Sequence, residues 1–143
     1  MTGPTMLYLI KQLELAVRSR LDELLRPESI TPLQYTALTV LERHADLSTA
    51  ALARNAFVTD QSAADMVAVL EERGLIARLR DPADRRRRVL RLTEPGVALL
   101  DRVRDQVAAV EAGMLAPLTD REAAAFRRYV IACRGALAEH PPH

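Results

Sequence analysis

The residues best able to bind a charged ligand lie in the arginine-rich stretch Arg78–Arg91. It has seven arginines and two aspartates in fourteen residues, a formal charge of +5 in a chain whose total is +1. The strand formers on both sides and the turn residues Asp81-Pro82-Ala83-Asp84 predict a β-hairpin. Positive charge concentrated on a near-neutral body is typical of proteins that bind a polyanion, most commonly nucleic acid.

A short helix, a turn and a longer helix are predicted just before this hairpin. Ser48 or Thr49 is expected to start the short helix, which ends near residue 55, and Thr59 to start the longer one over residues 60–73. Gly74 is expected to end it. Helical spacing turns Ala63, Met66, Val67 and Leu70 inward, and turns Gln61, Ser62 and Asp65 outward together with the small Ala64 and Ala68.

The outward face of this longer helix has side chains that can read DNA. Gln61 can pair bidentately with adenine, Ser62 can bind bases or phosphates, and Thr59 with the free amides of the first turn can bind phosphate. The alternative is an ordinary solvated helix face. With Thr59, Gln61 and Ser62, Asp65 is predicted to be a DNA-binding residue of this helix. Asp60 and Asp65 would also repel phosphate, so the hairpin is expected to supply most of the affinity.

Six helices and one hairpin are predicted in total, a mainly α fold. The other helices span about 7–25, 32–43, 94–116 and 120–138, and capping boxes at Thr31/Gln34 and Thr119/Glu122 start two of them. The order of the middle elements is that of a winged helix-turn-helix. The outer helices carry long apolar stripes, which predict a second copy of the chain as partner. The stripes comprise Ile10, Leu13, Val17, Leu21 and Leu24; Val97, Leu100, Val103, Val107, Val110 and Met114; and Phe126, Val130, Cys133 and Leu137.

Composition argues against several other classes of protein. The single cysteine excludes an internal disulfide, and no basic leader or membrane-spanning run is seen, which favours a cytoplasmic protein without membrane contact. His44, His140 and His143 form no cluster that would predict a metal site. There is no nucleophile–base arrangement and no glycine-rich phosphate loop, so we expect neither an enzyme nor a cofactor.

The run from Leu47 to Gly96 resembles the DNA-binding core of the MarR family of bacterial regulators. The resemblance rests on Leu75-Ile76 after Glu72-Arg73-Gly74, on Asp81-Pro82-x-Asp84-Arg85-Arg86, on Leu92-Thr93-x-x-Gly96 and on Thr31-Pro32-x-Gln34-Tyr35. It implies a single domain over 1–143, with a DNA-binding lobe at 31–92 and dimerisation helices at 7–26 and 94–138. It also implies a homodimer on a pseudo-palindromic operator in double-stranded DNA, acting as a repressor that a small molecule relieves.

The same resemblance assigns roles to individual residues. Asp84, Arg85 and Arg86 would form the wing tip in the minor groove, with Asp84 holding an arginine by a salt bridge. Arg87 and Arg88 would bind phosphate, or would act as the wing-tip residues themselves. A small lipophilic or phenolic ligand would bind between the dimerisation helices and the DNA-binding lobe, near Tyr35 and His44. Further phosphate contacts are expected at Ser48, Thr49, Arg54 and Arg78.

Two alternatives remain open from sequence. The winged helix could be a protein–protein module whose basic hairpin meets an acidic partner. The chain could also be a regulator that senses oxidants through Cys133, although the position of Cys133 on an apolar stripe favours a buried, structural thiol.

Overall fold

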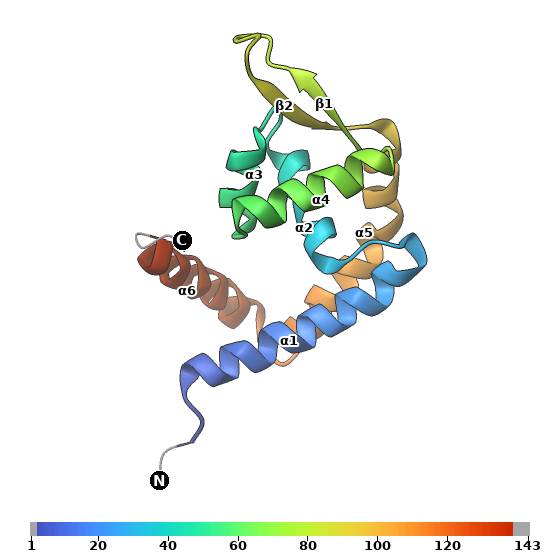
Figure 1. The fold of residues 1–143 in the computed structure, drawn as a ribbon. Coiled ribbons are helices and arrows are strands. Elements are labelled where there is room, and N and C mark those ends of the chain that lie inside the picture. The colour runs from blue at the N-terminus through green and yellow to red at the C-terminus, as the bar shows by residue number, and fades with distance from the viewer. Residues whose placement is uncertain (1–2, 139–143) are drawn as a thin grey trace. The chain divides into compact units, whose positions relative to one another are not determined.

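The computed structural model describes residues 3–138, which form helices and one two-stranded antiparallel sheet (Figure 1). The predicted mainly α, winged helix-turn-helix fold is confirmed. His140 and His143 lie outside the described residues. The elements are α1 (Met6–Leu25), the 3-10 turn η1 (Arg26–Glu28), α2 (Pro32–Arg43), α3 (Thr49–Ala56), α4 (Asp60–Glu72), β1 (Ile76–Arg80), β2 (Arg88–Leu92), α5 (Glu94–Leu115) and α6 (Asp120–Ala138).

The chain divides into two compact units, one ending at Val107 and the other beginning at Ala108. The first unit holds all elements from α1 to β2 and the first part of α5. One core joins these elements, because the helices α1 to α5 and both strands each contribute at least one side chain that is almost fully buried. These side chains include Leu25, Leu38, Leu52, Leu70, Ile76, Leu90 and Leu99.

Local capping explains where several helices begin. Thr31 and Gln34 form the predicted capping box, with the Thr31 Oγ1 accepting from the Gln34 amide at 3.1 Å and the Gln34 Oε1 accepting from the Thr31 amide at 3.0 Å. Thr119 and Glu122 exchange the same two bonds at the start of α6. Ser48, rather than Thr49, caps α3. Each cap satisfies backbone donors that the first helical turn leaves free.

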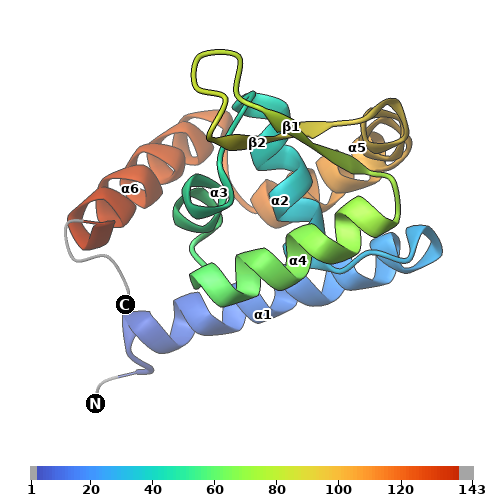
Figure 2. The ribbon, with the colours of Figure 1, turned by 45° about the horizontal axis from the view of Figure 1, so that its top comes forward.

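Helix α1 is buried only toward its C-terminal end. Leu25 is fully buried and Leu21 and Leu24 pack against the core, whereas Leu7 is 78% exposed and Ile10 is 55% exposed. In both views the hairpin of β1 and β2 and the helix α1 lie at opposite ends of the first unit (Figures 1 and 2). The exposed apolar half of α1 therefore lies far from the cationic hairpin.

The buried face of α5 differs from the predicted stripe at its start. Leu99, Leu100 and Val103 are buried, but Val97 is 42% exposed. The buried face of α5 begins at Gly96 instead of Val97. Gly96 packs so closely on the backbone of Leu75 that a Cβ at position 96 would collide with the carbonyl oxygen of Leu75. Because Gly96 is the contact point, Val97 points away from the core.

Helix α6, in the second unit, has no buried residue. Val130 and Leu137 of its predicted apolar stripe are exposed, and so is Cys133. The expectation of a buried Cys133 is therefore wrong for the single chain. The reason is that the stripe on α6 is not covered by residues of its own unit.

A group of polar contacts ties the turn after α1 to two other helices. Arg73, the C-cap of α4, donates to the backbone carbonyl oxygens of Ser29 at 2.6 Å and Glu28 at 2.9 Å. The Glu28 carboxylate in turn accepts from Arg102 of α5 at 2.7 Å. The segment Glu28–Ser29 thus connects the ends of α1 and α4 with α5.

Candidate nucleic-acid interface

Helix α4 has the two faces that its sequence pattern predicts. Ala63, Met66, Val67 and Leu70 are buried against the core. The opposite face, with Gln61, Ser62, Asp65, Ala64 and Ala68, is exposed. The Thr59 Oγ1 caps the helix by accepting from the Ser62 amide at 3.1 Å, so this hydroxyl is already engaged in the helix start.

Gln61 and Asp65 are joined on this exposed face. The Gln61 Nε2 donates to the Asp65 Oδ1 at 3.0 Å across one helical turn. A glutamine amide has two N–H donors and one carbonyl acceptor, so one donor and the acceptor stay free to face a base. The sequence pattern predicts Asp65 as a DNA-binding residue and as a charge that repels phosphate. Its pairing with Gln61 was missed, although a spacing of four residues is the signal for such a pair.

The turn between α3 and α4 holds a residue in an unusual conformation. Phe57, the C-cap of α3, has φ of 58°, in the left-handed region, and its side chain is 60% exposed. Left-handed backbone is unfavourable for residues other than Gly, Asn and Asp. The sequence pattern placed a turn here but did not predict this strain.

The tip of the hairpin consists of two consecutive hydrogen-bonded turns. The Asp84 amide donates to the Asp81 carbonyl oxygen at 3.2 Å, and the Arg87 amide donates to the Asp84 carbonyl oxygen at 3.0 Å. A third bond, from the Asp81 amide to the Arg87 carbonyl oxygen at 2.9 Å, closes the loop. These bonds fix the direction in which the side chains of the tip project.

The expected salt bridge from Asp84 to an arginine is not the contact that the structure shows. The Asp84 Oδ1 instead accepts from the backbone amide of Arg86 at 3.1 Å, and the Asp81 Oδ1 accepts from the Ala83 amide at 2.9 Å. Aspartate favours such bonds to its own backbone two residues on. Both acids of the tip therefore stabilise turns and leave the arginine side chains unpaired.

The four arginines of the tip and β2 start, Arg85–Arg88, are exposed. Within the described part of the chain, none of them takes part in an ion pair. The arginines nearer the body differ: Arg91 pairs with Asp46 at 2.7 Å, and Arg78 approaches Glu71 at 3.7 Å. Free positive charge is thus concentrated at the outer end of the hairpin. Figure 1 shows where this hairpin lies in the first unit.

The residues expected to contact phosphate around α3 are only partly accessible. Ser48 and Thr49 are half-buried, and the Ser48 Oγ accepts from the Ala51 amide at 3.1 Å. Arg54 is exposed near the end of α3. Of this group, Arg54 is the side chain best placed to reach a ligand.

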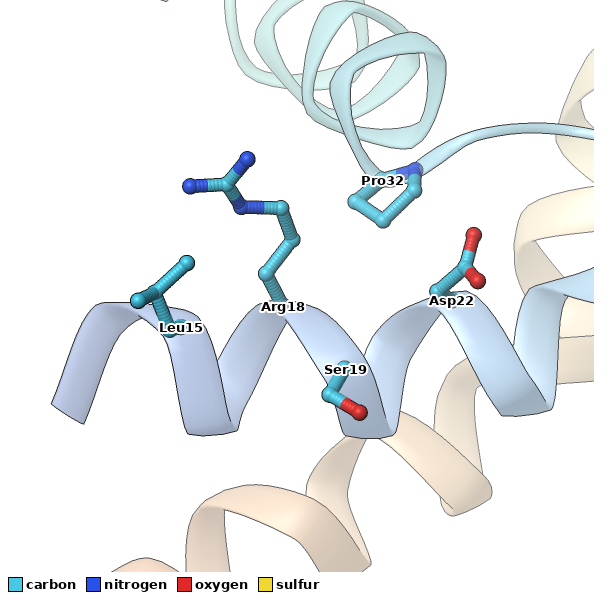
Figure 3. Close-up of a pocket in the computed structure, with 5 residues that line it drawn as sticks. All are labelled: Leu15, Arg18, Ser19, Asp22 and Pro32. Carbon is cyan, nitrogen blue, oxygen red and sulfur yellow. The ribbon is translucent and has the colours of Figure 1, made fainter. Parts of the chain in front are cut away.

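A shallow pocket of about 260 Å³ lies on α1, beside the start of α2 (Figure 3). It is lined by Leu15, Arg18, Ser19, Asp22 and Pro32.

The two polar groups expected near an effector do not line this pocket. Tyr35 is half-buried, and burial raises the pKa of its hydroxyl. His44 is exposed. In residues 3–138 no cluster of three or more His, Cys, Asp or Glu side chains is arranged to hold a metal ion.

An exposed helix with small and polar residues, preceded by a helix and a turn and followed by a cationic hairpin, defines a winged helix-turn-helix protein. Comparison with known proteins agrees, because the model of the MarR family matches residues 29–87. The chain belongs to the MarR family.

Two relatives show how far the similarity extends. The chain is 40% identical over 95 residues to a protein of Thauera aromatica described as a putative transcriptional regulatory protein for the hcr operon. This match covers 66% of the chain but only 57% of that protein. The chain is also 32% identical over 121 residues to the HTH-type transcriptional repressor Rv2887 of Mycobacterium tuberculosis. This match covers 85% of the chain and 87% of the repressor.

Solved structures share the fold. The MepR–DNA complex of Staphylococcus aureus gives a TM-score of 0.84 at 23% identity, covering 94% of this chain and 100% of that one. Rv2887 in complex with DNA gives 0.73 at 29% identity, over 92% and 98% of the two chains. PcaV of Streptomyces coelicolor, solved with its natural ligand, gives a TM-score of 0.75 at 27% identity, covering 95% of this chain and 99% of that one.

None of the described helices is both long and apolar enough to cross a membrane.

Proposed function

We propose that this chain is a transcriptional regulator that binds a pseudo-palindromic operator in double-stranded DNA as a homodimer. The observation that carries the proposal is the exposed, unpaired arginine group Arg85–Arg88, held on a hydrogen-bonded hairpin directly after a helix whose outer face is small and polar. A charged tip of this kind fits the narrow minor groove, where the negative potential is enhanced.

Helix α4 lies in the major groove in this arrangement. Its outer alanines, Ala64 and Ala68, let the helix backbone approach the base edges. Gln61 reads adenine, and Ser62 binds a base or a phosphate. Thr59 and the amides of the first turn lie against phosphate.

The hairpin and α3 supply the remaining contacts. Arg85 and Arg86 enter the minor groove, while Arg87 and Arg88 bind the phosphates beside it. Arg54 and Arg78 add phosphate contacts, with Ser48 and Thr49 close by. The family relative Rv2887, solved with DNA, supports a DNA-binding role for this surface.

Dimerisation follows from apolar surface that the single chain leaves exposed. Met6, Leu7 and Ile10 of α1 are each more than half exposed. In the second unit, Val130 and Leu137 of α6 are exposed in the same way. Exposed apolar side chains that recur along a helix are typical of an interface, and a second copy of the chain covers those of each unit in the proposed dimer.

We further propose that the chain is a repressor relieved by a small lipophilic or phenolic ligand. The pocket on α1 is the candidate site, because Leu15 and Pro32 offer apolar contact and Arg18 offers a cation at its wall. The guanidinium of Arg18 also pairs with Glu14, at 2.6 Å. The family member PcaV, solved with its natural ligand, is consistent with a ligand-controlled regulator. A role on the chromosome places the protein in the cytoplasm.

The decisive experiment measures binding of the purified full chain to duplex DNA from the region upstream of its own gene. Fluorescence anisotropy with excess unrelated DNA as competitor should give sequence-specific binding, and light scattering should give a dimer. If each subunit neutralises about three to five phosphates, log K should fall with log salt with a slope of roughly −5 to −9. Replacing Arg85 and Arg86 together by Ala should abolish specific binding. Unchanged affinity in this double variant would contradict the wing assignment, and binding no stronger than to competitor would favour an acidic protein partner.

A further inference from the structure

Two arginines of the hairpin face each other directly. The antiparallel register of β1 and β2 pairs Arg80 with Arg88, the last pair before the tip. Side chains of directly opposed residues lie on the same face of a sheet, with Cβ atoms about 4.5–5.5 Å apart. Both side chains are exposed. Like charges in this arrangement destabilise a hairpin.

No neighbouring acid relieves this repulsion. In residues 3–138, no carboxylate lies within 4.0 Å of the guanidinium of Arg80 or Arg88. The two acids of the tip, Asp81 and Asp84, accept hydrogen bonds from backbone amides of their own turns. The carboxylate of Glu71 pairs with Arg78 instead, at 3.7 Å. The pair therefore remains a concentrated positive charge at the base of the tip.

We propose that Arg80 and Arg88 bind one phosphate group of the DNA backbone between them, and that this contact removes a repulsion present in the free protein. Two guanidinium groups on one face offer several N–H donors to a single anion, and arginine suits phosphate because its planar fork binds two oxygens at once. The inference rests on the proposed DNA-binding function and assigns to Arg80 a role that the sequence pattern did not suggest.

The position of the pair fits a backbone contact rather than a base contact. The ordered turns of residues 81–87 extend beyond it, so the tip arginines reach further from the body than Arg80 and Arg88 do. When Arg85 and Arg86 occupy the minor groove, a pair set back from the tip lies at the level of the sugar–phosphate rim. A phosphate contact strengthens binding to every sequence and carries no sequence information.

The proposal predicts opposite effects on the stability of the free protein and on DNA binding. Arg80→Gln and Arg88→Gln should each raise the unfolding midpoint, and Arg80→Glu should raise it further because it forms a cross-strand ion pair with Arg88. On a duplex of about 30 base pairs, roughly three helical turns, each Gln variant should lose about tenfold in affinity. Specific and random duplexes should be affected alike, and the salt slope should fall by about 2, because the dimer loses one phosphate contact in each subunit.

A double-mutant cycle tests whether the two arginines hold the same phosphate. The Arg80→Gln/Arg88→Gln variant should lose less affinity than the product of the two single losses, and its salt slope should still fall by only about 2 for the dimer. Arg80→Gln combined with Arg54→Gln is the matched control, and its losses should multiply because Arg54 lies on α3.

The failures of the two proposals are distinguishable. A lower unfolding midpoint in Arg80→Glu, or full multiplicativity in the Arg80/Arg88 cycle, would overturn the shared phosphate site while specific DNA binding by the unmodified chain remains. Absence of DNA binding in the unmodified chain would overturn the proposed function and this inference with it.

Discussion

Arg102 of α5 holds the Glu28 carboxylate, which follows α1, with one N–H donor at 2.7 Å and a second that lies 3.2 Å from both oxygens. The hydrogen bond from Arg102 is the main cause of the lowered pKa of Glu28, and its positive charge adds to the effect. The two residues are 74 positions apart in sequence. This contact fixes the turn after α1 against α5 within the first unit.

The lowered pKa of Glu28 makes this contact pH-dependent. A carboxyl with a pKa below its unfolded value stabilises the fold above the unfolded pKa, about 4.3, and loses that contribution as the pH falls through the folded pKa. Glu28→Gln should therefore lower the unfolding midpoint at neutral pH. The difference from the unmodified chain should shrink as the pH falls below 4, in thermal unfolding followed by circular dichroism. A difference that stays constant down to pH 2 would show that the ion pair contributes nothing.

Gly96 should be intolerant of any side chain. A Cβ at this position would collide with the carbonyl oxygen of Leu75, a backbone atom that cannot move aside as a side chain does. We expect Gly96→Ala to destabilise the fold by about 1–3 kcal/mol, the usual range for overpacking. Gly113→Ala in the same helix is the control, because nothing lies within 4 Å of a Cβ there. The control should be neutral or stabilising by about 1 kcal/mol in urea unfolding.

Phe57 should be replaceable with a gain in stability. Its left-handed φ of 58° is unfavourable for Phe, whereas Asn adopts this conformation more readily, and its side chain is mostly exposed. Phe57→Asn should stabilise the fold by up to about 1 kcal/mol. Phe57→Ala should not, because Ala has the same difficulty at positive φ. Equal stability of the Asn and Ala variants would mean that the backbone conformation is not the cause.

Asp65 should contribute to sequence discrimination more than to affinity. Its carboxylate orients the Gln61 amide and at the same time repels phosphate. Asp65→Ala should therefore raise the affinity for random duplexes and reduce the preference for adenine at one position of each half-site, by roughly threefold to tenfold. Selection of bound sequences from a random library measures both effects. An unchanged base preference would argue against the orienting role.

The helices and their inward faces could be predicted because their causes are local. The capping boxes at Thr31 and Thr119 and the buried face of α4 follow from spacing within a few residues. The contact of Arg73 with Ser29 could not be predicted, because it joins positions 44 residues apart and depends on how helices pack. The exposure of Val97 in α5 could not be predicted either, because it depends on the close packing of Gly96 on the distant Leu75.

The candidate site was predictable in outline but not in its details. The arginine-rich hairpin and the exposed residues Gln61, Ser62 and Asp65 follow from composition and helical period. The opposition of Arg80 and Arg88 needs the strand register, which the hydrogen bonds of the seven-residue loop determine. Asp84 was assigned to an arginine side chain, and its bond to the Arg86 amide depends on the detailed geometry of the turn.

The attachment of Arg73 has a consequence for sequence variation after α1. The guanidinium of Arg73 donates to main-chain oxygens, which remain when the side chains of Glu28 and Ser29 are changed. These bonds join the C-terminal end of α4 to the segment that follows α1 within the first unit. The contact therefore tolerates substitutions in that segment.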